Sequence, residues 1–197
     1  MLTIHGMADS GNCYKPRLLM ALLGRPFRHV EVSTLDGGTK QPAFLAANPN
    51  GKVPLLELED GRTLPESNAI LCYLGDGTRF VPDDRFARAE MLGWMFFEQY
   101  SHEPQIAVRR SLLVYPQMRE AATPQRLADT LAGGHKALAV MEQRLSGAQW
   151  LVGDAPSLAD IALYAYTHRA GEGGFDLMDY PGIRAWLARI EGLSDYR

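Results

Sequence analysis

The chain has 197 residues, 46% of them hydrophobic and 22% charged, and a formal net charge of −3. These values are ordinary for a globular protein, and the slight acidity gives no basic footprint for nucleic acid. No apolar run reaches the ~18 residues of a membrane span, and the first residues lack the charged and apolar regions of a secretory signal. We therefore expect a cytoplasmic protein that binds neither membranes nor nucleic acid.

Cysteine and histidine are scarce and scattered. Two cysteines, Cys13 and Cys72, imply no disulfide framework, and this favours a reducing compartment. The histidines lack the spacing of metal ligands, so we predict no metal site. They are His5, His29, His102, His135 and His168.

Strand-like and helix-like segments alternate up to about residue 75. Strands are predicted at 2–5, 27–32, 53–58 and 62–64, and helices at about 12–23, 41–47 and 67–74. Pro16 lacks an N–H and is therefore placed in the first turn of the first helix. Asp60-Gly61 is a strong hairpin signal between the last two strands. The order βαβαββα predicts an α/β domain with a mixed sheet, which we assign to residues 1–76.

Beyond a Gly- and Pro-containing linker, strand signals vanish and long helical patterns follow. The predicted helices are Arg85–Tyr100, Pro104–Pro116, Pro124–Leu145, Ser157–Ala170 and Pro181–Ile190. We assign residues 84–197 to an all-α domain. Ser157 and Asp160 form a capping-box pattern, which favours a folding role for Asp160 over a catalytic one. The segment 91–97 is apolar on nearly all faces, so the bundle or a partner subunit must cover it on more than one side.

Three short segments of the first half suggest a groove for a small acidic peptide that carries a thiol. Ser10 stands just before the first helix, where a hydroxyl and free backbone N–H groups converge; a simple helix cap is the alternative interpretation. The backbone of Val53, before Pro54, could face outward and bind an extended peptide by strand addition. Glu66-Ser67 opens a helix and offers a site for a carboxylate.

The residues that define these segments match a known family. The matching stretches are Ser10–Lys15, Asn48–Pro54, Leu64–Leu71, Tyr100–Pro104, Ser157–Leu163 and Glu172–Leu177. With them, the chain resembles the cytosolic glutathione transferases, in particular bacterial, serine-type members, over essentially its whole length. The resemblance implies a thioredoxin-like N-terminal domain and an all-α C-terminal helical bundle. It also implies a homodimeric detoxification enzyme that activates glutathione for attack on small electrophiles.

The resemblance assigns a role to each matching residue. Ser10 takes the position of the thiol-activating serine, and Asn12 is a second donor near the sulfur. Glutathione itself, the co-substrate, would be bound by Lys40, Lys52, Val53, Pro54, Glu66 and Ser67. In that set Val53 and Pro54 meet the cysteinyl backbone, Glu66 and Ser67 the γ-glutamyl end, and both lysines the glycyl carboxylate. The electrophile is placed between the domains, near Met7, Tyr100, Ser101, Ile106 and Arg110.

Two other functions remain open. A cysteine in the first turn of a helix can have a lowered pKa, so Cys13 could serve a glutathione-dependent disulfide or peroxide reductase. In cysteine-using relatives, however, the reactive residue occupies position 10, which favours a structural Cys13 that faces the interior. Cys72 lies in an apolar helical run and is predicted to be core. A non-catalytic binding or scaffold module is the third possibility, and the natural electrophile is not predicted.

One basic pair has two interpretations. Arg109-Arg110 is most simply explained as part of a solvated helix face. Alternatively, Arg110 steers an anionic co-substrate.

Overall fold

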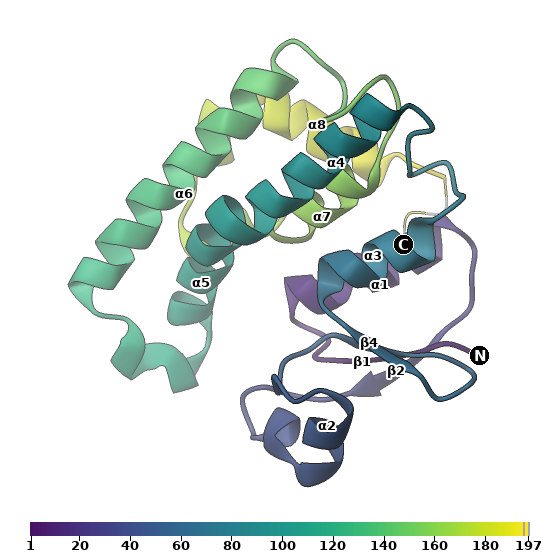
Figure 1. Cartoon of the computed structure of the whole chain (residues 1–197). Helices are drawn as coiled ribbons and strands as arrows, with labels where there is room; N and C mark the ends of the chain where they lie inside the picture. The colour runs from purple at the N-terminus through teal and green to yellow at the C-terminus, as the bar shows by residue number, and fades with distance from the viewer. Residues whose placement is uncertain (195, 197) are drawn as a thin grey trace. The chain divides into compact units, whose positions relative to one another are not determined.

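A computed structural model describes residues 1–194 and 196. These residues form two compact units, one of Met1–Asp76 with the last described residues from Leu193, and one of Gly77–Gly192. The first unit has a four-stranded sheet with helices and the second is helical (Figure 1). The predicted fold class, an α/β unit followed by an all-α unit, is confirmed.

The first unit follows the predicted order βαβαββα. Its strands are β1 (Thr3–Gly6), β2 (Arg28–Glu31), β3 (Leu55–Glu57) and β4 (Thr63–Pro65). Its helices are α1 (Gly11–Leu22), α2 (Pro42–Ala47) and α3 (Ser67–Gly75). The sheet order is β2-β1-β3-β4, with β1 parallel to β2 and both other pairs antiparallel. The β3–β4 hairpin turns at Gly61, whose φ of 84° requires glycine.

The two faces of the sheet are covered differently. Ile4 and Leu56 pair across β1 and β3 and are fully buried on the face that α1 and α3 cover. The other face carries the paired residues His5 and Leu55, and α2 lies over it (Figure 1). None of the residues of α2 is buried, so this helix covers its side of the sheet only loosely.

The second unit contains α4 (Arg85–Phe97), α5 (Glu103–Val114), α6 (Pro124–Leu145), α7 (Leu158–Thr167) and α8 (Pro181–Glu191). These are the predicted helices, with ends shifted by a few residues. The predicted break between the first two is wrong, because a π-helical segment, Glu98–His102, joins α4 directly to α5. All ten residues of α7 are buried, which makes this helix the centre of the unit.

Asp160 connects three parts of the second unit. The predicted capping box is formed, and the backbone N–H of Ser157 donates to the Asp160 carboxylate at 2.8 Å. The backbone N–H of Leu151 and the indole N–H of Trp186 donate to its other oxygen at 3.1 and 2.9 Å. Asp160 therefore joins the loop before α7, the start of α7 and α8.

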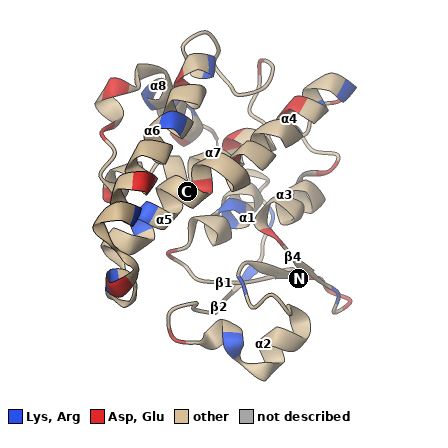
Figure 2. Cartoon of the chain, turned by 60° about the vertical axis from the view of Figure 1, so that its left-hand side comes forward, with Lys and Arg blue, Asp and Glu red and all other residues tan. Residues whose placement is uncertain are grey.

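The charged residues are mixed in sign (Figure 2), and the described helices are not of the membrane-spanning kind. Among the described helices, none combines the length and the apolar character that a membrane crossing requires. Figure 2 shows that basic and acidic residues are interspersed along the helices rather than gathered by sign. This distribution agrees with 20 basic and 23 acidic residues in the sequence.

Candidate active site

Ser10 is the N-cap of α1. Its hydroxyl oxygen accepts the backbone N–H of Cys13 at 3.4 Å, and its carbonyl accepts the N–H of Tyr14 at 2.9 Å. An accepting hydroxyl uses a lone pair and keeps its O–H hydrogen as a donor, and within the chain the Cys13 thiol lies within hydrogen-bonding reach of it. The first amides of α1 point past the same end of the helix and favour negative charge there. The hydroxyl and the helix end therefore suit a bound anion.

The start of α1 corrects one prediction. The helix begins at Gly11, so Pro16 lies in its second turn and not in its first. Ser10, as the N-cap, sets the first residue of α1, and the position of Pro16 does not. The missing N–H of Pro16 affects only the carbonyl of Asn12, one turn earlier.

A buried lysine joins the starts of α1 and α3. Lys15 is fully buried, and its Nζ donates to Asn12 Oδ1 at 2.8 Å, to Ser67 Oγ at 3.2 Å and to Asn68 Oδ1 at 3.4 Å. Ser67 Oγ also donates to Asn12 Oδ1 at 3.2 Å. Two of the predicted site residues, Asn12 and Ser67, are thus in direct contact. Because Asn12 Oδ1 faces Lys15, the geometry of the amide turns Nδ2 away from it.

Sequence reasoning missed Lys15. Its three-residue spacing from Asn12 is one at which side chains on a helix meet, and this was the available signal. The type of residue points the other way, because lysine is almost never fully buried.

The segment before β3 presents its backbone. The Val53–Pro54 peptide bond is cis. In the described part of the chain, no backbone group bonds to the N–H or C=O of Val53. Glu66, the N-cap of α3, has φ 73° and ψ 113°, and among the described residues it is the one non-glycine with positive φ. Such backbone conformations are costly and gather at binding sites.

Lys40 and Lys52 lie in adjacent segments. Lys40 Nζ donates to the carbonyl of Gly51 at 3.4 Å, and the carbonyl of Lys52 accepts from Asn48 Nδ2 at 2.7 Å. Both lysine residues are exposed. The two cations therefore flank one loop, directly before Val53.

The residues predicted for the electrophile have different environments. Tyr100 is 88% exposed and Ser101 is half-buried, both in the π-helical segment. Ile106 is 1% exposed and belongs to the core. Met7, in the first unit, is buried, and its sulfur accepts from Thr34 Oγ1 at 3.7 Å. The role of these residues stays a prediction.

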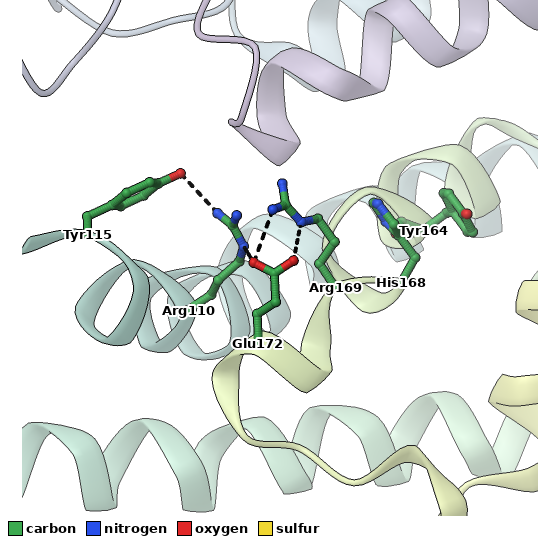
Figure 3. Close-up of polar contacts among 6 residues, drawn as sticks. All are labelled: Arg110, Tyr115, Tyr164, His168, Arg169 and Glu172. Atoms are coloured by element: carbon green, nitrogen blue, oxygen red, sulfur yellow. Dashed lines mark hydrogen bonds and ion pairs between the residues drawn. The ribbon is translucent and has the colours of Figure 1, made fainter. Parts of the chain in front are cut away.

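Arg110 is itself buried and belongs to an ion-pair cluster whose other members are partly exposed, so its interpretation as a solvated side chain is wrong (Figure 3). Its Nε donates to Glu172 at 2.8 Å and its Nη1 to the Tyr115 hydroxyl at 2.9 Å. Arg169 donates to the same carboxylate at 2.6 and 3.0 Å. Hydrogen bonds from Arg169 and the charges of both arginines hold the pKa of Glu172 below its usual value. Arg109 is engaged too, by two backbone carbonyls.

Cys13 and Cys72 differ from each other in exposure. Cys13 is fully buried, and burial raises the pKa of its thiol. A Cβ atom on Gly6 would lie 2.8 Å from the Cys13 sulfur, so the thiol packs closely against β1. Cys72 is only partly buried, so its assignment to the core is wrong. Neither environment favours a thiolate, and Cys13 is the less accessible of the two.

Comparisons with known proteins show which family the chain resembles in sequence and fold. Residues 9–76 match the family model of the glutathione S-transferase N-terminal domain, and residues 124–189 that of the C-terminal domain. A glutathione S-transferase structure from Pseudomonas fluorescens Pf-5 is 50% identical, with a TM-score of 0.96 over 100% of this chain and 97% of that one. A glutathione transferase from Burkholderia graminis, solved with two glutathione molecules per subunit, is 26% identical. Its TM-score is 0.84, over 99% of this chain and 85% of that one.

One curated relative carries a different activity in its name. The disulfide-bond oxidoreductase YfcG of Escherichia coli K12 is 29% identical. The match covers 93% of this chain and 87% of the relative.

Proposed function

Because this chain belongs to the glutathione S-transferase family and is a glutathione transferase, we propose that Ser10 activates the glutathione thiol. The observation that carries the proposal is the place of Ser10 at the N-terminus of α1. A thiolate there would receive the Ser10 O–H hydrogen bond and the positive end of the helix dipole. The relative from Burkholderia graminis supports glutathione as the co-substrate, since it holds this tripeptide.

The remaining residues fit the charges of the tripeptide. The unpaired backbone of Val53, next to Pro54, would bond to the cysteinyl unit as an added strand does. Glu66 and Ser67, at the start of α3, would hold the ammonium and carboxylate of the γ-glutamyl end. The glycyl carboxylate and the sulfur of glutathione need further partners.

The exposed lysines 40 and 52 would attract the glycyl carboxylate. Asn12 Nδ2, turned away from Lys15, would be a second donor to the sulfur. Every charged group of glutathione then has a partner of opposite charge or a donor.

Disulfide reduction is the second candidate, and the similarity to YfcG favours it. In that reaction glutathione bound at Ser10 would attack a disulfide instead of an electrophilic carbon. The buried thiol of Cys13 argues against the variant of this chemistry that uses a protein cysteine. Both reactions therefore share the Ser10 site and differ in the second substrate.

Replacing Cys13 by alanine should leave activity within about twofold of wild type. The expected cost is ~1 kcal/mol of stability, because a small buried group is lost. Initial rates with glutathione are measured for wild type and for Cys13→Ala, on a chlorodinitrobenzene and on hydroxyethyl disulfide. In the wild-type protein, iodoacetamide should label Cys72 before Cys13. A wild-type rate of conjugation above the rate of disulfide reduction supports the transferase, and a higher rate of disulfide reduction favours the reductase. A large loss of either activity in Cys13→Ala would show that the cysteine takes part.

A homodimer is our proposal for the assembly. α4 and the π-helical segment expose large apolar side chains on one side, namely Phe86, Leu92, Phe96 and Tyr100, with exposed fractions of 72, 37, 71 and 88%. Exposed apolar stripes of this kind are typical of subunit interfaces. We further propose that the protein acts in the cytoplasm and that its role there is detoxification. Support comes from the two cysteines, both free, which fit a reducing compartment.

The dimer is testable by mass. Light scattering at micromolar concentration should give twice the chain mass of 21.8 kDa. Phe96→Asp places a charge in the stripe and should shift the protein toward monomer. Val140→Asp, at a 44% exposed apolar position of α6, is the matched control and should stay dimeric. A wild-type monomer would rule out this proposal.

A further inference from the structure

The first unit contains a cavity between α2 and the sheet. It measures about 450 Å³, within the ~300–1,000 Å³ range of small-molecule pockets. The cavity exists because α2 has six residues, none of them buried, and presents alanines beside one aromatic ring, Phe44. The helix therefore stands over the sheet without filling the space below it.

The cavity wall is mainly apolar, and its polar side chains are those of His5, Gln41, Glu57 and Thr63. Phe44 and Ala47 of α2 and Leu55 of β3 supply the apolar surface. On the same wall, His5 Nε2 lies 2.6 Å from Glu57 Oε2. An ionised carboxylate can only accept, so His5 donates through Nε2–H and holds the carboxylate in place. In the described part of the chain, no hydrogen bond reaches Glu57 Oε1, which leaves that oxygen for a ligand.

The charge of the wall selects the ligand. With neutral His5, the pair carries the negative charge of Glu57, and with protonated His5 it carries none. The wall has no lysine or arginine. An anion therefore finds no lysine or arginine here, while a cation finds a partly exposed carboxylate that His5 holds in place.

We propose that this cavity is a second binding site, for a small molecule that joins an aromatic or aliphatic body to a protonated amine. The apolar body packs against Phe44 and Leu55, and the ammonium donates to Glu57. None of the residues assigned to glutathione lines the cavity, so the two ligands bind at separate places. The cavity still adjoins that site in sequence, since Leu55 follows Pro54 and the lining residue Gln41 follows Lys40.

Three probes of nearly equal shape test the charge preference. Phenethylamine, phenethyl alcohol and hydrocinnamate carry a cation, a neutral hydroxyl and an anion on the same phenyl body. Calorimetry and thermal shift on the full chain should give phenethylamine an affinity at least about tenfold above that of the other two. In NMR spectra, the amine should shift the methyl signals of Ala43 and Ala47, which both line the cavity. Equal affinities, or shifts elsewhere only, would overturn the proposal.

Matched variants locate the site. Glu57→Gln keeps the shape and an acceptor for His5 but removes the charge, so the amine should lose about tenfold in affinity and the alcohol should change little. Ala47→Phe fills the cavity and should abolish binding of all three probes. Glu59→Gln, at an exposed carboxylate outside the cavity, is the control and should bind as wild type.

All three variants should keep the conjugating activity, which shows that they fold. If Glu57→Gln fails to fold, the Ala47→Phe variant and the comparison of the three probes still show whether the amine binds in the cavity. Unchanged amine binding in a folded Ala47→Phe variant would overturn the proposal.

Discussion

Ser10→Ala is expected to lower kcat/KM for a chlorodinitrobenzene by roughly 10- to 100-fold. A free thiol with a pKa of about 8.5 is only a few per cent thiolate at neutral pH. Lowering that pKa by about two takes ~2.7 kcal/mol of preferential stabilisation of the anion. One hydrogen bond to a charged group supplies ~1.5–3 kcal/mol, and the helix end ~0.3–2. Losing the hydroxyl therefore removes the larger contribution.

The control for Ser10→Ala separates chemistry from folding. Ser10 also caps α1, so its loss costs ~1 kcal/mol of stability. Thr123→Ala removes the equivalent cap of α6, where Thr123 Oγ1 accepts the N–H of Arg126 at 3.2 Å. It should lower stability similarly without changing kcat/KM. Ser10→Thr keeps the hydroxyl and should retain most activity, whereas full activity in Ser10→Ala would transfer the role to Asn12 or to backbone amides.

Asp160→Ala is expected to reduce the free energy of unfolding by ~3–5 kcal/mol. The substitution leaves the buried N–H groups of Ser157, Leu151 and Trp186 without their acceptor. Each unsatisfied buried donor costs ~1–3 kcal/mol, partly recovered by relaxation and water. For a chain of this length the melting temperature should fall by roughly 10 °C. Calorimetry measures both quantities.

Two variants show whether this effect is specific. Asp154→Ala removes an exposed carboxylate from the preceding loop and should change stability by less than ~0.5 kcal/mol. Asp160→Asn keeps one acceptor oxygen and should fall between alanine and wild type. Below its melting transition, Asp160→Ala should conjugate at nearly the wild-type rate per folded molecule. An inactive but fully stable variant would instead indicate a catalytic aspartate.

Local signals were enough to predict most of the fold. The order of the first unit follows from short apolar runs and from turn residues such as Asp60-Gly61, whose effects act within a few positions. The capping box at Ser157 and Asp160 is local in the same way. The continuity of α4 and α5 was missed because Pro104 signals a helix start and says nothing about the π-helical turn before it.

The site was predictable where it depends on short motifs. Ser10 caps a helix, and Glu66-Ser67 opens one, as the sequence indicates. Contacts between distant segments were not predictable. Lys15 meets Ser67 across 52 positions, and Arg110 meets Glu172 across 62. Periodicity carries no information on such pairs, so it predicts neither the burial of Lys15 nor that of Arg110.

Whether Ser10 lowers the pKa of the glutathione thiol can be measured on the bound tripeptide itself. Ultraviolet absorbance of the thiolate is followed against pH in complexes of glutathione with wild type and with Ser10→Ala. For the wild-type complex we expect a pKa about two below the free value of about 8.5, and for the variant a return most of the way to that value. A wild-type complex that titrates like free glutathione would contradict it.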